Sequence, residues 1–198
     1  MNYLAHAYLS YGDTQLLTGN MIADHVKGQK PLLLLPEGIA NGIHLHRKID
    51  AFSDIHPAVN RAKIWFREPY RLYAGAILDT LWDHFLANDA AAFPSDEDLK
   101  SFSQRTYASL EDNSNWLPPT FANYLPHMKE HDWLFNYKNI RGIQRSLQGL
   151  ERRANYIPPI KEAYDIFIGR YYQLAQCYYE LIDDLQAYVK NEIVAIRG

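Results

Sequence analysis

The most constraining feature of this sequence is the ten-residue stretch from Ile77 to Leu86, which reads ILDTLWDHFL. On a helix, its large apolar side chains cover one half of the cylinder: Leu78, Leu81, Trp82, Phe85 and Leu86. The other half carries only short polar side chains, which are Asp79, Thr80, Asp83 and His84. A helix face that is exposed to water usually carries long Lys, Glu, Gln and Arg side chains instead. Because carboxylates and imidazole are typical ligands of divalent cations, this stretch predicts one wall of a metal site.

The rest of the chain also reads as helical. Apolar residues recur at helical spacing, and the sequence shows no alternating strand pattern, internal repeat or low-complexity tract. We therefore expect an all-α fold, a single-domain bundle of about eight or nine helices spanning residues 1–198. Turn and capping residues place the first helices at about 2–11, 16–27, 36–52, 57–66, 70–88 and 95–110.

The composition limits the compartment and the partners. A formal charge of −3 gives no indication of nucleic-acid binding, and the longest aliphatic run, Leu32 to Leu35, is far too short to cross a membrane. Cys177 is the single cysteine, so no internal disulfide is possible. The first residues show no signal-peptide pattern. We expect a cytoplasmic protein without nucleic-acid or membrane partners.

Further Asp and His residues lie on apolar helix faces. His6 is among the packing residues of the first helix, where a lone histidine is more often a core residue whose N–H finds a carbonyl. Asp24 is either an exposed side chain or a ligand that projects into the core from the second helix. His46 and Asp50 continue an apolar stripe of the third helix, and Arg47 lies to one side of that stripe. These two form either a self-satisfied core pair or part of a metal site.

Known catalytic motifs are missing, since the chain has no P-loop, HExxH, CxxC or GxSxG pattern. What remains is a set of Asp and His residues on or beside core-facing stripes: Asp24, His46, Asp50, Asp79, Asp83 and His84. Mixed carboxylate and imidazole ligands without thiolate favour Mn²⁺, Mg²⁺, Fe²⁺ or Zn²⁺ in a catalytic role. Such a set suggests metal-assisted phosphoester hydrolysis, because a metal lowers the pKa of bound water and neutralises charge on phosphoryl oxygens.

Two later helices have faces that suggest partners. Between Lys138 and Tyr156 the only acidic residue is Glu151, whereas four arginines line the same helix: Arg141, Arg145, Arg152 and Arg153. This run is either a solvated face or a docking surface for something acidic. In the terminal helix, Tyr, Leu and Ile recur at helical spacing. That stripe is either core or the seam of a homo-oligomer.

The sequence closely resembles the acyl carrier protein phosphodiesterase family, a divergent branch of the HD phosphohydrolases. The resemblance lies in the segments NYLAH, GNMIADHVKG, HRKID and LDTLWDHFL, and it continues more loosely beyond Pro94, through WLFNY and 147–153. It implies a distorted HD-domain-like bundle that hydrolyses the phosphodiester joining 4′-phosphopantetheine to a serine of holo acyl carrier protein. Mn²⁺ is the metal that it implies. The adjacent pair Asp83-His84 is inverted relative to the usual His-Asp order of HD proteins.

The resemblance also suggests roles. The expected metal ligands are Asp24, His46, Asp50, Asp83 and His84, with Asp79 or Asp50 ligating or orienting a ligand. His6 matches the N-terminal motif and is the candidate acid for the leaving serine, and Arg47 would stabilise phosphoryl oxygens. Because acyl carrier protein is acidic, the arginine-rich helix becomes its expected docking face.

Two alternatives remain open. An HD-type hydrolase acting on a nucleotide or other small phosphoester would use the same metal residues without a docking face. A non-enzymatic helical binding protein would use the Asp and His residues as buried polar pairs.

Overall fold

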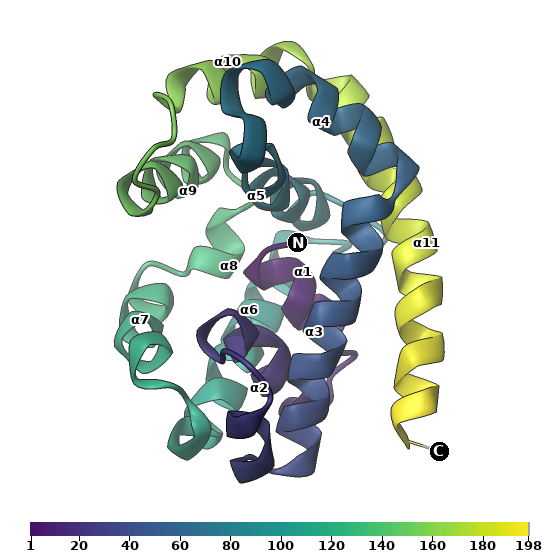
Figure 1. Ribbon diagram of the computed structural model, residues 1–198, viewed down its shortest axis with the longest axis vertical. Coiled ribbons are helices and arrows are strands. Elements are labelled where there is room, and N and C mark those ends of the chain that lie inside the picture. Colours follow the sequence, from purple (N-terminus) through teal and green to yellow (C-terminus); the bar gives the residue numbers. More distant parts are fainter. Residues whose placement is uncertain (198) are drawn as a thin grey trace.

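The computed structural model describes residues 1–197, and every regular element in them is helical, which confirms the all-α prediction (Figure 1). These residues form eleven α-helices, more than expected, because the four-residue α8 is separate from α9 and the last helical segment is divided at Arg170. The helices are α1 (Tyr3–Tyr8), α2 (Thr14–Ile22), α3 (Glu37–Ile55), α4 (Pro57–Tyr70), α5 (Ala74–Ala87), α6 (Asp96–Asp112), α7 (Pro119–Glu130), α8 (Trp133–Asn136), α9 (Ile140–Arg153), α10 (Lys161–Gly169) and α11 (Tyr171–Arg197). Short 3₁₀ segments lie at Ala23–His25 (η1), Lys30–Leu34 (η2), Arg71–Tyr73 (η3) and Ser114–Trp116 (η4).

The stretch ILDTLWDHFL forms most of α5, which lies between α9 and α4 in the middle of the molecule (Figure 1). Helices α1, α4 and α9 all pack against it. Its buried residues therefore include Asp83 and His84 as well as the large apolar side chains. The face of α5 that was expected to line a metal site is exposed only near the start of the helix, at Ala76 and the partly exposed Asp79.

Helices α2 and α3 pack closely because two glycines face each other where they cross. A Cβ on Gly19 would lie 2.0 Å from the carbonyl oxygen of Ile39, and one on Gly42 would lie 2.3 Å from that of Leu16. Neither distance leaves room for a side chain, so only glycine permits this approach. The close crossing brings the buried Asn20 of α2 against His46 of α3.

Helix α2 ends at Ile22, earlier than the expected end near residue 27, and the chain continues as η1 into the extended Val26. The Arg47 guanidinium explains this departure, because its Nη2 donates to the carbonyls of Val26 and Gly28, each at 3.1 Å. Asp24 therefore lies on a 3₁₀ turn that Arg47 holds against α3.

Helix α11 runs along α3 and α4 (Figure 1). The apolar stripe of this helix is buried inside the chain itself, at residues that include Leu174, Leu181, Leu185 and Val189. The stripe is thus part of the core, and a homo-oligomer through this helix stays a prediction. Although α11 is 27 residues long, neither it nor any other helix within residues 1–197 is long and apolar enough to cross a membrane.

Candidate metal centre

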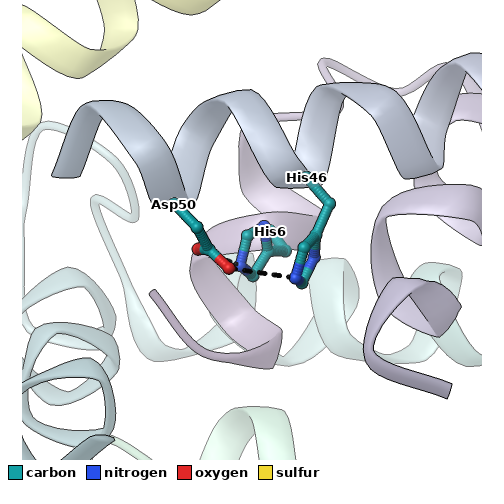
Figure 2. A group of neighbouring side chains, drawn as sticks. All are labelled: His6, His46 and Asp50. Carbon is teal, nitrogen blue, oxygen red and sulfur yellow. Dashed lines mark ion pairs between the residues drawn. The ribbon is translucent and has the colours of Figure 1, made fainter. Parts of the chain in front are cut away.

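Three predicted residues converge where α1 meets α3. Figure 2 shows His6 from α1 facing His46 and Asp50, which share one face of α3 because they are four residues apart. Asp50 Oδ1 lies 3.3 Å from His6 Nε2, and Asp50 Oδ2 lies 3.1 Å from His46 Nε2. The two imidazoles stack with their centroids 3.8 Å apart and 15° between their planes. One nitrogen or oxygen from each residue lies within 4.8 Å of the others, so all three could bind one ion.

Asn20 orients both imidazoles. Its Nδ2 donates to the main-chain oxygen of His6 at 2.8 Å and to Ser10 Oγ at 3.1 Å, which turns Oδ1 toward His6 Nδ1, also at 2.8 Å. The main-chain oxygen of Asn20 lies 2.8 Å from His46 Nδ1. Since both partners are acceptors, each Nδ1 carries a proton, and each ring, once Nε2 is deprotonated, presents the lone pair of that atom.

Those two Nε2 atoms are the strongest indication of a bound cation. Both are buried and lack a hydrogen-bond partner among the described residues, although carboxylate oxygens lie 3.1 to 3.3 Å away. A lone pair that faces a carboxylate is repelled unless a proton or a metal lies between them. Ligands at about 2.1 Å from a metal, at right angles, lie about 3 Å from each other, which is the spacing found here. The donor set therefore fits a divalent metal.

Asp24 adds a carboxylate on the open side of this group. Its Oδ1 lies 3.3 Å from His46 Nε2, and its side chain is 75% exposed. Arg47 holds the turn that carries Asp24 through the two carbonyls of Val26 and Gly28. The expectation that Arg47 contacts a phosphoryl group does not match this placement, because its guanidinium is bound to main-chain oxygens.

The charges in the group are strongly coupled. Burial would raise the pKa of Asp50, but His46, His6 and the Met1 ammonium outweigh it and hold that pKa well below its usual range. Burial and the charge of His46 lower the pKa of His6 to about 4. For His46, burial is outweighed by Asp24 and Asp50, which raise its pKa to about 9. The carboxylates are therefore ionised near neutral pH and attract a cation, which in the absence of a metal is the proton on His46 Nε2.

Asp79 is linked to Asp50 of this group through the α-amino group of Met1. The α-amino group of Met1 donates to Asp79 Oδ1 at 2.8 Å and to Asp50 Oδ1 at 3.3 Å. Burial alone would lower the pKa of this amine, but Asp79 and Asp50 raise it to about 11. The pKa of Asp79 is itself raised, chiefly by burial. Asp79 is thus beside the three converging residues and is not one of them.

Asp83 is hydrogen-bonded to the start of α1. It is fully buried, and its two carboxylate oxygens accept the main-chain N–H groups of Leu4 at 2.8 Å and Ala5 at 3.1 Å. Asn2, at the N-cap position of α1, makes no side-chain cap bond, so Asp83 satisfies these donors from another helix. Burial raises the pKa of Asp83 to about 7 despite these hydrogen bonds.

His84 is also fully engaged. Its Nδ1 lies 2.8 Å from the main-chain oxygen of Tyr137, its Nε2 lies 3.0 Å from the Tyr171 hydroxyl, and Phe167 packs edge-on against its ring. The structure therefore does not bring Asp83 or His84 to the group of His6, His46 and Asp50. Their expected role as metal ligands does not fit, because α5 is enclosed by other helices and their polar atoms already have partners.

The arginine-rich helix α9 leaves its cations free. Arg141, Arg145, Arg152 and Arg153 are all exposed and form no ion pair in the part of the chain that the structure describes. Burial and the charge of Asp24 raise the pKa of Tyr3 to about 12, while Arg153 opposes this shift. Arg153 is therefore within electrostatic reach of Tyr3 at the start of α1.

Asn20 is the site residue that the sequence analysis missed. It is an amide between apolar neighbours on a helix whose other buried residues include Leu16, Leu17, Met21 and Ile22. A polar side chain in such surroundings needs buried partners, and that requirement is a signal that the sequence does contain. The identity of those partners depends on the crossing of α2 and α3.

Comparisons with known proteins give one consistent family. A family model described as acyl carrier protein phosphodiesterase matches residues 1–185. A protein of that name from Enterobacter sp. (strain 638) is 30% identical over 192 residues, which cover 97% of this chain and 99% of the relative. Another, from Salmonella agona (strain SL483), is 33% identical over 167 residues, or 84% of this chain and 86% of the relative. No solved structure matches the chain.

Proposed function

Because the chain belongs to the acyl carrier protein phosphodiesterase family, we propose that it hydrolyses the phosphodiester between 4′-phosphopantetheine and a serine of holo acyl carrier protein. The products are apo acyl carrier protein and 4′-phosphopantetheine. Water forms a new bond to phosphorus, the bond from phosphorus to the serine oxygen breaks, and the serine oxygen takes up a proton.

We further propose that His6, His46 and Asp50 hold a divalent metal and that Asp24 adds a carboxylate from the open side. Two imidazoles and two carboxylates without a thiolate suit Mn²⁺, the first candidate, and also Fe²⁺, Mg²⁺ or Zn²⁺. When bound, such an ion lowers the pKa of water and neutralises phosphoryl charge. The observation that carries this assignment is the pair of buried Nε2 atoms that have no hydrogen-bond partner among the described residues.

The remaining steps fall to residues around these ligands. Asn20 keeps both imidazoles in the tautomer that presents Nε2. The leaving serine oxygen is strongly basic and needs a proton donor. His6 was the expected donor, but its Nε2 points at Asp50 within the ligand group. Asp79 is partly exposed and one contact from Asp50, but it accepts from the Met1 ammonium as a carboxylate, so in our proposal solvent water supplies this proton.

The direct test is to incubate the protein with holo acyl carrier protein and Mn²⁺ and to follow the mass of the carrier. We expect the carrier to lose its phosphopantetheine group. His46→Ala should abolish this loss, whereas His127→Ala, which removes an exposed histidine on α7, should leave it unchanged. An unchanged carrier mass with the wild-type protein would contradict the proposal.

The docking face is tested separately. The exposed, unpaired arginines of α9 would attract an acidic carrier, so Arg145→Glu with Arg152→Glu should raise KM for the carrier about tenfold and leave kcat unchanged. The effect should shrink as salt is added. An unaltered KM would contradict the docking role of α9; hydrolysis of a nucleotide or other small phosphoester in place of the carrier would favour the alternative substrate class, which needs no docking face.

A further inference from the structure

A polar pocket of about 410 Å³ lies between α4 and the beginning of α5. Three cationic side chains line it: Lys63 and Arg67 from α4, and Arg71 from η3. Asp79 lines it as well, and the same residue contacts the Met1 amine that contacts Asp50. The pocket therefore adjoins the candidate metal centre, and its three cationic side chains have no role assigned above.

The charges of the pocket are not balanced by the protein. Lys63 pairs with Asp54 at 3.0 Å, and Asp79 pairs with the Met1 amine. Arg67 and Arg71 form no ion pair or side-chain hydrogen bond within residues 1–197. The guanidinium groups of Arg67 and Arg71 are thus available to bind an anion.

The three cationic side chains also lie near the N-terminus of α5, where the helix dipole is positive. Helix α5 has no acidic residue in its first turn and no side-chain cap, so the positive end of its dipole lies at the pocket without a carboxylate from that turn, although the Ala74 N–H already donates to the Arg71 carbonyl. Lys63 lies over this turn, because a Cβ on Gly75 would be 4.0 Å from Lys63 Nζ. Cations beside a helix N-terminus repel its dipole, and a bound anion would turn this repulsion into attraction.

We propose that this pocket binds a phosphate group and receives the phosphomonoester that the reaction releases. Guanidinium forks and the positive ends of helix dipoles are features that proteins use to bind phosphate. Hydrolysis of a phosphodiester converts a monoanion into a phosphomonoester with a second ionisable oxygen, so the product gains charge and is attracted more strongly than the substrate. The assignment of the reaction product to this pocket rests on the proposed function, whereas the binding of phosphate does not.

The first experiment measures the binding of inorganic phosphate to the full chain by calorimetry, with a chelator present so that phosphate on a metal does not contribute. Arg67→Gln with Arg71→Gln should weaken binding by about tenfold or more, the effect of losing a charge-assisted hydrogen bond. Arg105→Gln removes an exposed cation of α6 and should bind phosphate like the wild type. No binding by the wild type, or equal binding by the double variant, would overturn the site.

A second variant tests Arg71 without straining the backbone. Arg71 has φ 46° and ψ −110°, a conformation that favours glycine, so Arg71→Gly removes the guanidinium and keeps the turn. It should weaken phosphate binding while leaving the unfolding temperature at or above that of the wild type. Full phosphate affinity in this variant would contradict the role of Arg71.

The third measurement concerns the product itself. Inhibition by 4′-phosphopantetheine should weaken about tenfold in the Arg67→Gln, Arg71→Gln variant, in proportion to its loss of phosphate affinity. Equal inhibition of variant and wild type would overturn the product assignment and leave the anion site intact. If the wild type binds phosphate but does not hydrolyse the carrier, the proposed function fails and the phosphate site stands.

Discussion

Two groups of Asp and His residues in this protein look alike in the sequence and differ in the structure. One group joins His6 of α1 to His46 and Asp50 of α3, and the other is the adjacent pair Asp83-His84 of α5. Burial does not separate them, because His6 and His84 are each 2% exposed. What separates them is the partners of the ring nitrogens.

In the first group, each histidine uses one nitrogen on Asn20 and directs the other at carboxylates without hydrogen-bond geometry. In the second, His84 uses both nitrogens on Tyr137 and Tyr171. A histidine with two ordinary partners is complete as a structural residue. A buried histidine with one orphaned nitrogen needs something else, and here a divalent cation fits.

The largest expected effect comes from removing a ligand of the first group. His46→Ala should lower kcat/KM for holo acyl carrier protein about a thousandfold or more, because a catalytic metal contributes several kcal/mol to transition-state stabilisation. The variant should stay folded, since the lost ring makes one hydrogen bond within the protein, to the main-chain oxygen of Asn20. Turnover assays with Mn²⁺ measure kcat/KM, and far-ultraviolet circular dichroism measures the helical content. Activity within tenfold of the wild type would contradict the assignment of His46 to the metal site.

The opposite pattern is expected for the second group. Asp83→Ala leaves the buried N–H groups of Leu4 and Ala5 without acceptors, which should cost about 2 to 4 kcal/mol of unfolding free energy. Urea unfolding should show a lower midpoint, while the folded fraction keeps its affinity for Mn²⁺. A variant of normal stability that no longer binds metal would mean that Asp83 is a ligand after all.

A smaller effect is expected from Asn20, which positions both imidazoles without contacting the metal. Asn20→Ala should weaken Mn²⁺ affinity about 10- to 100-fold, as is usual for residues that orient ligands. Excess Mn²⁺ should restore kcat, which a merely destabilised protein would not show. Titration of activity with Mn²⁺ checks this, and an unchanged midpoint would remove Asn20 from the site.

Much of the fold was predictable because it depends on local chemistry. Helical periodicity indicated an all-α chain, and the predicted cap at Ser95 is present, since its Oγ accepts the N–H of Asp98. Spacing along one helix also placed His46 and Asp50 together, and the structure brings them to the same ion-binding group. These features need knowledge of only one helix at a time.

The rest depends on how helices meet. A helical wheel gives α5 an apolar and a polar half, but α1, α4 and α9 enclose both halves, so Asp83 finds main-chain N–H groups of α1. The role of Asn20 exists only because Gly19 and Gly42 let α2 and α3 come into contact. Arg47 was expected at a phosphoryl group because the sequence does not show that the chain after Ile22 leaves the helix.

The most direct test of the central claim is the metal content of three purified proteins after incubation with Mn²⁺ and removal of free ion. We expect the wild type and His84→Gln to retain the same amount of metal per chain and His46→Ala to retain essentially none. Retention by His46→Ala together with loss from His84→Gln would show that the metal lies at α5, and the account of this centre would be wrong.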